Sequence, residues 1–337
     1  MSINSSISSS DESPAWRRCL AACYGTLAAG AAVILLLMVV VDPYDSGKFG
    51  LLGIAGVNDR IEPLADVSRA RDAQFDSAIF GNSTVQLLDP AELSPATGKR
   101  FVQLVSPGSD PRGHIAIMEF FIRHHRQIGA FVVGIDSAWC VHEMAPLPKT
   151  AFPFWLYNES KLDYASNLFT WRAIDHLFRR IAIGLGMRRP MRADGYWSYE
   201  EVWPPGRKQP EPTPLKFSTF GGRVDPSYSF KTLLEETISK LAPDVSVVFV
   251  MPPTFYTLVP PPGSQEAAEH EACKAAYRSI IAGRAHSNIL DYRIDNALTR
   301  DANNFADLIH YRAKIAHKLE AGVAASLREG EAARVEF

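Results

Sequence analysis

Residues 78–84 read Ala-Ile-Phe-Gly-Asn-Ser-Thr, a short apolar run that ends in a glycine, with a serine two residues later. Such a run is typical of a buried strand in a parallel sheet, and Gly81 permits a sharp turn that presents Ser83 at the carboxyl end of that strand. The backbone N–H groups that follow are suited to an anion. A serine needs a base to become a nucleophile. The best candidate lies far downstream, where Asp307 and His310 are separated by only two residues.

These residue types can form a Ser-His-Asp triad. His310 would take the Ser83 proton and later return it, while Asp307 would orient the imidazole and stabilise its charged form. The developing oxyanion needs preorganised donors, and the backbone N–H groups of Ser83 and Gly108 are the predicted ones. Each feature also has a plain structural explanation, since Gly-Asn-Ser can simply end a strand and an aspartate can cap a helix. No third ligand accompanies the Asp-His pair, so we predict neither a metal nor a cofactor.

The elements that must position these residues follow from hydrophobic periodicity. Apolar runs predict strands at residues 77–80, 100–105, 130–136, 245–250 and 288–292. Helical patterns predict helices at residues 61–73, 85–93 with a break near Pro95, 114–126, 230–241, 265–282 and 311–327. This alternation predicts an α/β protein with a doubly wound parallel sheet and right-handed crossovers. Ligands of such sheets bind beyond the carboxyl ends of the strands, where Ser83, Asp136 and His310 are expected to meet.

Residues 140–228 interrupt the alternation with many prolines and aromatic residues, and only one helix is expected there, at 162–183. We interpret this stretch as an insertion that caps the active edge of the sheet. Its aromatic side chains could stack on sugar rings, or they could form a small satellite core.

The amino-terminal part predicts a membrane anchor. Residues 19–41 carry no charge and are long enough, at about 1.5 Å per residue, to cross a hydrocarbon core of about 30 Å. A poor cleavage site follows, which favours an anchor over a cleaved signal peptide. Arg17 and Arg18 precede the segment, so residues 1–18 are expected to be a disordered cytoplasmic tail. Residues 42–74 would be a juxtamembrane lead-in to an exported domain, which is periplasmic if the membrane is a bacterial inner membrane.

Composition excludes some classes of function. The 337 residues carry a formal net charge of -2, which argues against nucleic acid as a partner. Of the four cysteines, two lie in the apolar segment. Cys140 and Cys273 could pair, but no spacing demands it, and ordinary free cysteines are the favoured interpretation.

The order of the motifs resembles the SGNH (GDSL-like) hydrolase superfamily across about residues 75–325, and residues 75–330 are expected to form the corresponding domain. Residues 79–83 are similar to its first motif, with Asn82 where the family usually has aspartate. Gly108 is similar to the oxyanion glycine of the second motif. Residues 307–311 resemble the last motif, which supplies the aspartate and the histidine. The resemblance implies a three-layer, flavodoxin-like parallel sheet and a serine hydrolase site.

The third motif departs from the family pattern. It is usually Gly-x-Asn-Asp, and its asparagine donates to the oxyanion, whereas residues 134–137 read Gly-Ile-Asp-Ser. An ionised carboxylate cannot donate, so another donor must substitute or the site is weakened. The candidate substitutes are Asn82, Ser109 and Ser137. The residues expected to contact substrate are Asp136, Ser137 and Tyr311.

The chain is also similar to membrane-anchored SGNH-like proteins of bacterial envelopes, such as alginate O-acetylation and D-alanine transfer proteins. The shared features are the anchor, Asp-Pro-Tyr directly after it, Gly-Asn-Ser, a Pro-Pro pair after the fourth strand, and Asp-x-x-His-Tyr. The resemblance implies an extracytoplasmic serine esterase or O-acyltransferase that acts on a polysaccharide or acylated glycan. Other envelope assembly proteins are possible partners. The alternative is an inactive anchored scaffold or glycan-binding protein.

Overall fold

A computed structural model describes residues 14–54, 56–57, 62–140, 152–204 and 228–330. Five parallel strands form one sheet in the order β2-β1-β3-β4-β5. The strands are β1 (Ser77–Gly81), β2 (Phe101–Val105), β3 (Ala130–Gly134), β4 (Ser246–Met251) and β5 (Asn288–Asp291). This order is that of a flavodoxin-like doubly wound sheet, whose ligand crevice lies beside β1 and β3. The predicted α/β class and parallel sheet are confirmed.

Helices cover both faces of the sheet and make three layers. One face carries α4 (Pro111–His124), α9 (Ser229–Ser239) and α10 (Gln265–Ile281), and the other carries α3 (Pro90–Thr97) and α12 (Ala313–Glu329). Neighbouring side chains of β1 point to opposite cores, Phe80 toward the α4 side and Ile79 toward the α12 side. Both are fully buried, as expected for a central strand.

Several shorter elements complete the described chain. They are α2 (Glu62–Arg69), α5 (Phe154–Tyr157), α6 (Lys161–Asn167), α7 (Trp171–Gly184), α11 (Ala297–Arg300), and the 3₁₀ turns η1 (Ser83–Val85), η2 (Ser137–Cys140), η3 (Tyr199–Glu201), η4 (Tyr256–Leu258) and η5 (Ala302–Asn304).

Two predicted helices differ from those observed because of their caps. The helix expected from residue 85 begins at Pro90, since Asp89 accepts the Ala91 N–H as the N-cap, and it continues through Pro95 instead of breaking there. The single helix expected at 162–183 is two helices, α6 and α7. Thr170 begins the second one by accepting the Ala173 N–H.

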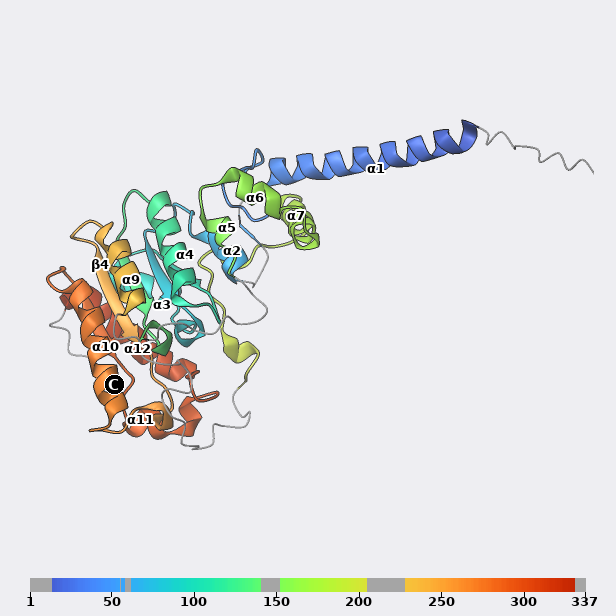
Figure 1. The fold of residues 1–337 in the computed structure, drawn as a ribbon. Helices are drawn as coiled ribbons and strands as arrows, with labels where there is room; N and C mark the ends of the chain where they lie inside the picture. Colours follow the sequence, from blue (N-terminus) through green and yellow to red (C-terminus); the bar gives the residue numbers. More distant parts are fainter. Residues whose placement is uncertain (1–13, 55, 58–61, 141–151, 205–227, 331–337) are drawn as a thin grey trace, which may run out of the picture.

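The helix α1 (Pro14–Val41) extends away from the sheet domain (Figure 1). Its segment Trp16–Val41 is long and apolar enough to cross a membrane, the only such helix in the described residues. It begins before the predicted anchor, because a proline is well tolerated at the first helical position. Most of the predicted cytoplasmic tail lies outside the described residues.

The Asp-Pro-Tyr motif connects α1 to the domain through hydrogen bonds and an aromatic contact. The Asp42 carboxylate accepts the Gly47 N–H at 2.8 Å and a hydrogen bond from the Tyr164 hydroxyl. Tyr44 is buried and lies edge-on to Trp155 with ring centroids 5.4 Å apart. The first residues of the lead-in are therefore packed into the protein by specific contacts.

Cys140 and Cys273 form a disulfide with their Cα atoms 5.8 Å apart, so the expectation of free cysteines was wrong. The bond joins the turn after β3 to α10. The two cysteines are separated by 133 positions in the chain, and only the folded arrangement brings them into contact.

The aromatic insertion divides into two parts. Helices α5, α6 and α7 gather at the base of α1 (Figure 1), where α7 contacts α1. The later part runs along β2, the edge strand, whose Gln103 N–H donates to the Asp194 carbonyl at 2.7 Å. Within the described residues of the insertion, this later part is the one that reaches the candidate site. Residues 141–151 and 205–227 of the insertion lie outside the described residues.

Candidate functional site

The serine lies on a tight turn at the end of β1. Gly81 has φ +151°, and a Cβ atom there would lie 2.6 Å from a methyl group of Val85. A Cβ on Gly134 of the neighbouring strand would lie 2.9 Å from the same side chain. Two glycines thus leave room for Val85 to fold back under the turn, which fixes Ser83 at the sheet edge.

The structure brings Ser83, His310 and Asp307 together in one chain of hydrogen bonds. The Ser83 Oγ lies 2.8 Å from His310 Nε2, and His310 Nδ1 lies 2.7 Å from an Asp307 carboxylate oxygen. The other Asp307 oxygen accepts the backbone N–H of His310 at 2.8 Å, so the Asp-x-x-His turn aims both side chains the same way. With Nδ1–H donating to Asp307, Nε2 is free to accept the serine proton.

Electrostatics favour an ionised Asp307. Burial raises the pKa of this carboxyl group, but hydrogen bonds from the His310 ring and from backbone amides outweigh burial. Its pKa therefore lies below the ordinary value. A carboxylate in this place stabilises a positively charged imidazole beside it.

Aromatic side chains of the insertion pack around the imidazole. The Trp203 ring centroid lies 5.0 Å from that of His310, and the Tyr199 ring lies 5.4 Å away. The Tyr199 hydroxyl donates to the Tyr311 carbonyl, and the Arg312 guanidinium donates to the Trp203 carbonyl. These contacts confine His310, and the sequence did not identify either aromatic residue as its neighbour.

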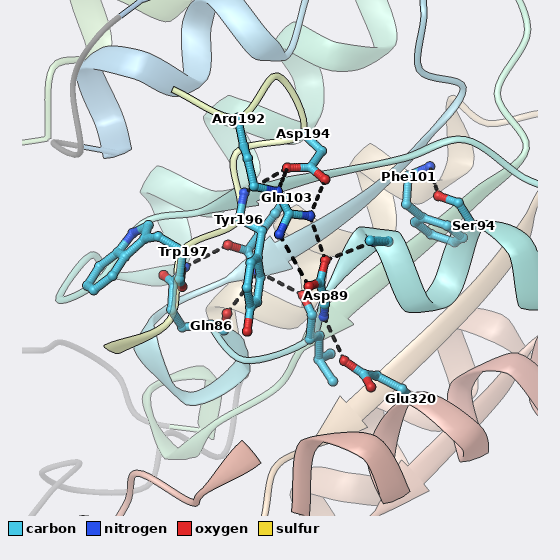
Figure 2. Close-up of polar contacts among 12 residues, drawn as sticks. Gln86, Asp89, Ser94, Phe101, Gln103, Arg192, Asp194, Tyr196, Trp197 and Glu320 are labelled. Carbon is cyan, nitrogen blue, oxygen red and sulfur yellow. Dashed lines mark hydrogen bonds and ion pairs between the residues drawn. The ribbon is translucent and has the colours of Figure 1, made fainter. Parts of the chain in front are cut away.

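A polar network holds this part of the insertion against the sheet (Figure 2). The Arg192 guanidinium pairs with Asp89 at 2.8 Å and with Asp194 at 2.5 Å. The Asp89 N–H donates to Glu320 at 2.7 Å, which connects the network to α12. The segment that carries Trp203 is therefore anchored to the loop after β1 and to the last helix.

A pocket of about 200 Å³ opens beside Ser83. The predicted residues that line it are Asn82, Ser83, Gly108, Ser109, Asp136 and Ser137. Tyr311 does not line it and is buried in the core on the α12 side. Thr254 and Arg293 line the pocket but were not predicted. They follow β4 and β5, so the strand-end rule that found Asp136 also points to them.

The donors near Ser83 differ in what they already bind. Among the described residues, the N–H groups of Ser83 and Gly108 donate to no other group. The Ser109 hydroxyl donates to the Ser106 carbonyl at 2.7 Å and is thus committed to its own turn. The two backbone amides are the better placed anion donors.

Asn82 and Asp136 are in direct contact. The Asn82 side-chain amide donates to the Asp136 carboxylate, while its oxygen accepts the Thr84 N–H at 3.0 Å. An asparagine amide carries two N–H groups, so one remains after the bond to Asp136. Asp136 also accepts the Ala138 N–H at 2.9 Å. Desolvation raises the Asp136 pKa, and the nearby positive charge of Arg293 opposes that shift.

No group of three or more His, Cys, Asp or Glu side chains in the described parts of the chain is arranged to hold a metal ion. Neither known protein families nor curated proteins gave a match to this chain.

Proposed function

We propose that this protein is a serine esterase or O-acyltransferase that acts on an acylated polysaccharide outside the cytoplasm, with Ser83, His310 and Asp307 as its triad. The observation that carries the proposal is the continuous hydrogen-bonded chain from Ser83 Oγ through the imidazole to Asp307, with distances of 2.8 and 2.7 Å. A serine at a strand-end turn, beside a pocket and beside a confined histidine, has the geometry of an activated nucleophile.

The first half of the reaction makes an acyl-enzyme. Ser83 Oγ attacks the ester carbonyl carbon while its proton moves to His310 Nε2, and the carbonyl oxygen becomes an oxyanion. The imidazolium then gives this proton to the departing alcohol oxygen as the C–O bond breaks. In the second half, water or a sugar hydroxyl loses its proton to His310 and attacks the acyl carbon. His310 returns the proton to Ser83, and the acid or the new ester leaves.

Three donors would stabilise the oxyanion in this scheme, namely the N–H groups of Ser83 and Gly108 and the second amide N–H of Asn82. The usual pattern of the resembled superfamily has aspartate before the serine and asparagine in the third motif. Here the two residue types are exchanged, and Asn82 contacts Asp136. The exchange supports Asn82 as the replacement for the missing third-motif asparagine, with Asp136 as the residue that positions it.

Two features support an extracytoplasmic location. The helix α1 is long and apolar enough to be a membrane anchor. The Cys140–Cys273 disulfide is typical of proteins in oxidising compartments such as the bacterial periplasm.

The decisive experiment uses the full-length protein in detergent micelles. It should release 4-nitrophenol from 4-nitrophenyl acetate and react at Ser83 with a fluorophosphonate probe. Ser83→Ala should abolish both signals, and His310→Gln should lower the hydrolysis rate by at least about 10³-fold. Equal hydrolysis by wild type and Ser83→Ala, with no labelling, would reject the enzyme. Retained glycan binding in that case would favour the anchored glycan-binding alternative.

A further inference from the structure

Arg293 is a buried cation in the wall of the pocket that contains Ser83. Its side chain is 4% exposed, and it follows β5 at the same edge as the candidate triad. Its Nε and Nη1 atoms have no hydrogen-bond partner among the described residues. The same is true of the hydroxyl of Thr254, which lines the pocket and is also buried. Buried donors in folded proteins usually have a partner, which can be another protein group, water, an ion or a ligand.

The acidic groups around Arg293 have other partners. Asp291 pairs with Lys274 at 2.6 Å and accepts the Arg293 backbone N–H at 3.0 Å. Asp136 accepts from Asn82 and from a backbone amide. Both carboxylates attract the Arg293 charge through space, but among the described residues neither forms a direct ion pair or hydrogen bond with its guanidinium. His270 also influences Arg293, but burial lowers its pKa to about 4, so it adds no charge at neutral pH.

A charged guanidinium buried without a hydrogen-bonded counterion is strongly unfavourable. Arginine does not lose its proton in proteins, so an anion that accepts hydrogen bonds from the unpaired Nε and Nη1 atoms would compensate this charge best. A carboxylate meets it best, because a guanidinium–carboxylate pair makes short, charge-assisted hydrogen bonds. A phosphate monoester carries about two negative charges and suits a single cation beside Asp136 less well.

We propose that Arg293 and Thr254 bind a carboxylate of the substrate next to the ester that Ser83 attacks. The apolar wall formed by Leu258, Ala138 and Ile309 would contact the carbon skeleton. The substrate is thus an acidic ester, and this conclusion rests on the proposed function. The carboxylate can belong to an acidic sugar or to the far end of a dicarboxylic acyl group.

Two matched substrate pairs separate these sources. The acyl pair is mono-4-nitrophenyl adipate and its methyl ester, which differ in the terminal charge and in one methyl group. The sugar pair is an acetylated methyl glucuronoside and the corresponding acetylated methyl glucoside, assayed by acetate release. Wild-type protein should favour the acidic member of one pair by at least about 10-fold in kcat/KM. The pair that shows the preference identifies the source.

In Arg293→Met, the ratio of kcat/KM for the acidic ester to kcat/KM for its neutral counterpart should fall close to one, whatever the absolute rate of the variant. Arg293→Lys should retain part of the preference for the acidic ester. Equal kcat/KM within both pairs, or an unchanged ratio in Arg293→Met, would overturn the carboxylate site. Competition by monomethyl adipate, but not by dimethyl adipate, gives a readout on wild-type protein alone.

Failure of the proposed function is a separate result. If wild type hydrolyses none of the four esters, the enzyme is rejected, and calorimetry then tests the site directly. Monomethyl adipate or methyl glucuronoside should still bind wild type and not Arg293→Met. Absence of binding by both compounds would reject the carboxylate site as well.

The protein also has an exposed apolar surface whose role does not depend on enzyme activity. Large apolar side chains that are 51–85% exposed gather on the lead-in and on the helices at the base of α1. These residues, here called the collar, are Leu51, Leu52, Leu162, Phe169, Trp171, Phe178, Leu185 and Met187. Figure 1 shows α6 and α7 beside the end of α1 that joins the domain. Exposed apolar groups in such number mark an interaction surface.

The collar adjoins the point where α1 would leave the membrane. The helix α7 packs its Leu177 and Ala173 side inward, yet Trp171 and Phe178 remain exposed on another side. Tryptophan and other aromatic residues favour the membrane–water interface. We infer that the collar lies in the lipid headgroup region and holds the domain against the membrane.

The test places nitroxide labels on full-length protein in phosphatidylethanolamine–phosphatidylglycerol vesicles, with Cys19→Ser and Cys23→Ser as the background. Labels at Trp171→Cys and Phe178→Cys should be reached by oxygen and shielded from a water-soluble nickel relaxant. A label at Leu233→Cys, on the partly exposed α9, is the matched control and should be reached by nickel. Equal nickel access at all three positions would reject the membrane contact.

Discussion

At the scale of single residues, the exchanged pair Asn82 and Asp136 decides how the oxyanion is stabilised. The aspartate of the single variant Asn82→Asp lacks the amide donor and faces a second carboxylate. We expect kcat to fall about 10²-fold, as for the loss of one oxyanion donor. Asp136→Asn removes the acceptor that orients Asn82 and should reduce kcat less. KM should change little in both.

The double variant Asn82→Asp/Asp136→Asn is the control for this pair. It restores the residue types usual in the resembled superfamily, so it should recover most of the wild-type kcat. A double variant as impaired as Asn82→Asp would contradict the idea that the two side chains work as a unit. Steady-state kinetics with 4-nitrophenyl acetate measures all four proteins, and a normal melting curve confirms that each is folded.

His114 makes the stability of the fold sensitive to acid. Its ring is buried with both nitrogens unpaired in the described part of the chain, and burial lowers its pKa to about 4, against a weaker opposing effect of Asp110. The unfolded chain binds this proton near pH 6.5 and the folded protein only near 4. As the pH falls through that window, the free energy of unfolding should drop by up to about 3 kcal/mol.

The variant His114→Met should flatten this dependence, because it cannot take up the proton. Urea unfolding of full-length protein in micelles, followed by tryptophan fluorescence between pH 7 and 4.5, measures the slope. Wild-type protein measured under the same conditions is the reference for this slope. An unchanged slope in His114→Met would show that other groups cause the acid sensitivity.

At the scale of elements, the insertion must lie flat on the edge strand to bring Trp203 to His310. Gly195 has φ +81°, and a Cβ atom there would lie 2.5 Å from the Gln103 carbonyl oxygen of β2. Gly98 has φ +70° with nothing within 4 Å of the added atom. Gly98→Ala should thus lower the free energy of unfolding by about 1 kcal/mol, through the strained backbone alone. Gly195→Ala should lower it by at least about 2 kcal/mol more, because the added Cβ atom clashes with a backbone oxygen that cannot easily move.

Gly195→Ala should also lower the ester hydrolysis rate, whereas Gly98→Ala should not. The comparison of two glycines in similar conformations separates backbone strain from displacement of the insertion. Denaturant unfolding and steady-state hydrolysis give the two readouts. Equal effects of both substitutions would mean that the insertion does not depend on its contact with β2.

At the scale of the whole molecule, the sequence predicted those features of the site that depend only on the order of strands and helices. Ser83, Asp136 and His310 come after β1, β3 and β5, so their meeting at one edge follows from the parallel sheet. The same rule covers Arg293 and Thr254, but their importance depends on burial and on unpaired atoms, which have no local signature.

Long-range packing explains what the sequence did not predict. The approach of Trp203 to His310 depends on the Gln103–Asp194 hydrogen bond, between residues remote in the chain. The disulfide likewise depends on α10 packing beside η2. Neither the aromatic-rich composition nor the cysteine spacing specifies these contacts.

The disulfide offers a test of the proposed orientation of the chain. If Arg17 and Arg18 keep the amino terminus in the cytoplasm, the domain is exported to a compartment in which Cys140 and Cys273 can oxidise. Reversing the two charges with Arg17→Glu/Arg18→Glu should leave part of the protein inverted, with its domain in a reducing compartment. In the Cys19→Ser/Cys23→Ser background, maleimide–polyethylene glycol should shift that fraction on a gel and leave the parent unshifted. A parent with fully reactive thiols in cells would contradict export.

Cys140→Ala/Cys273→Ala should lower the free energy of unfolding by about 2–5 kcal/mol, so the inverted, reduced fraction should also be the less stable one.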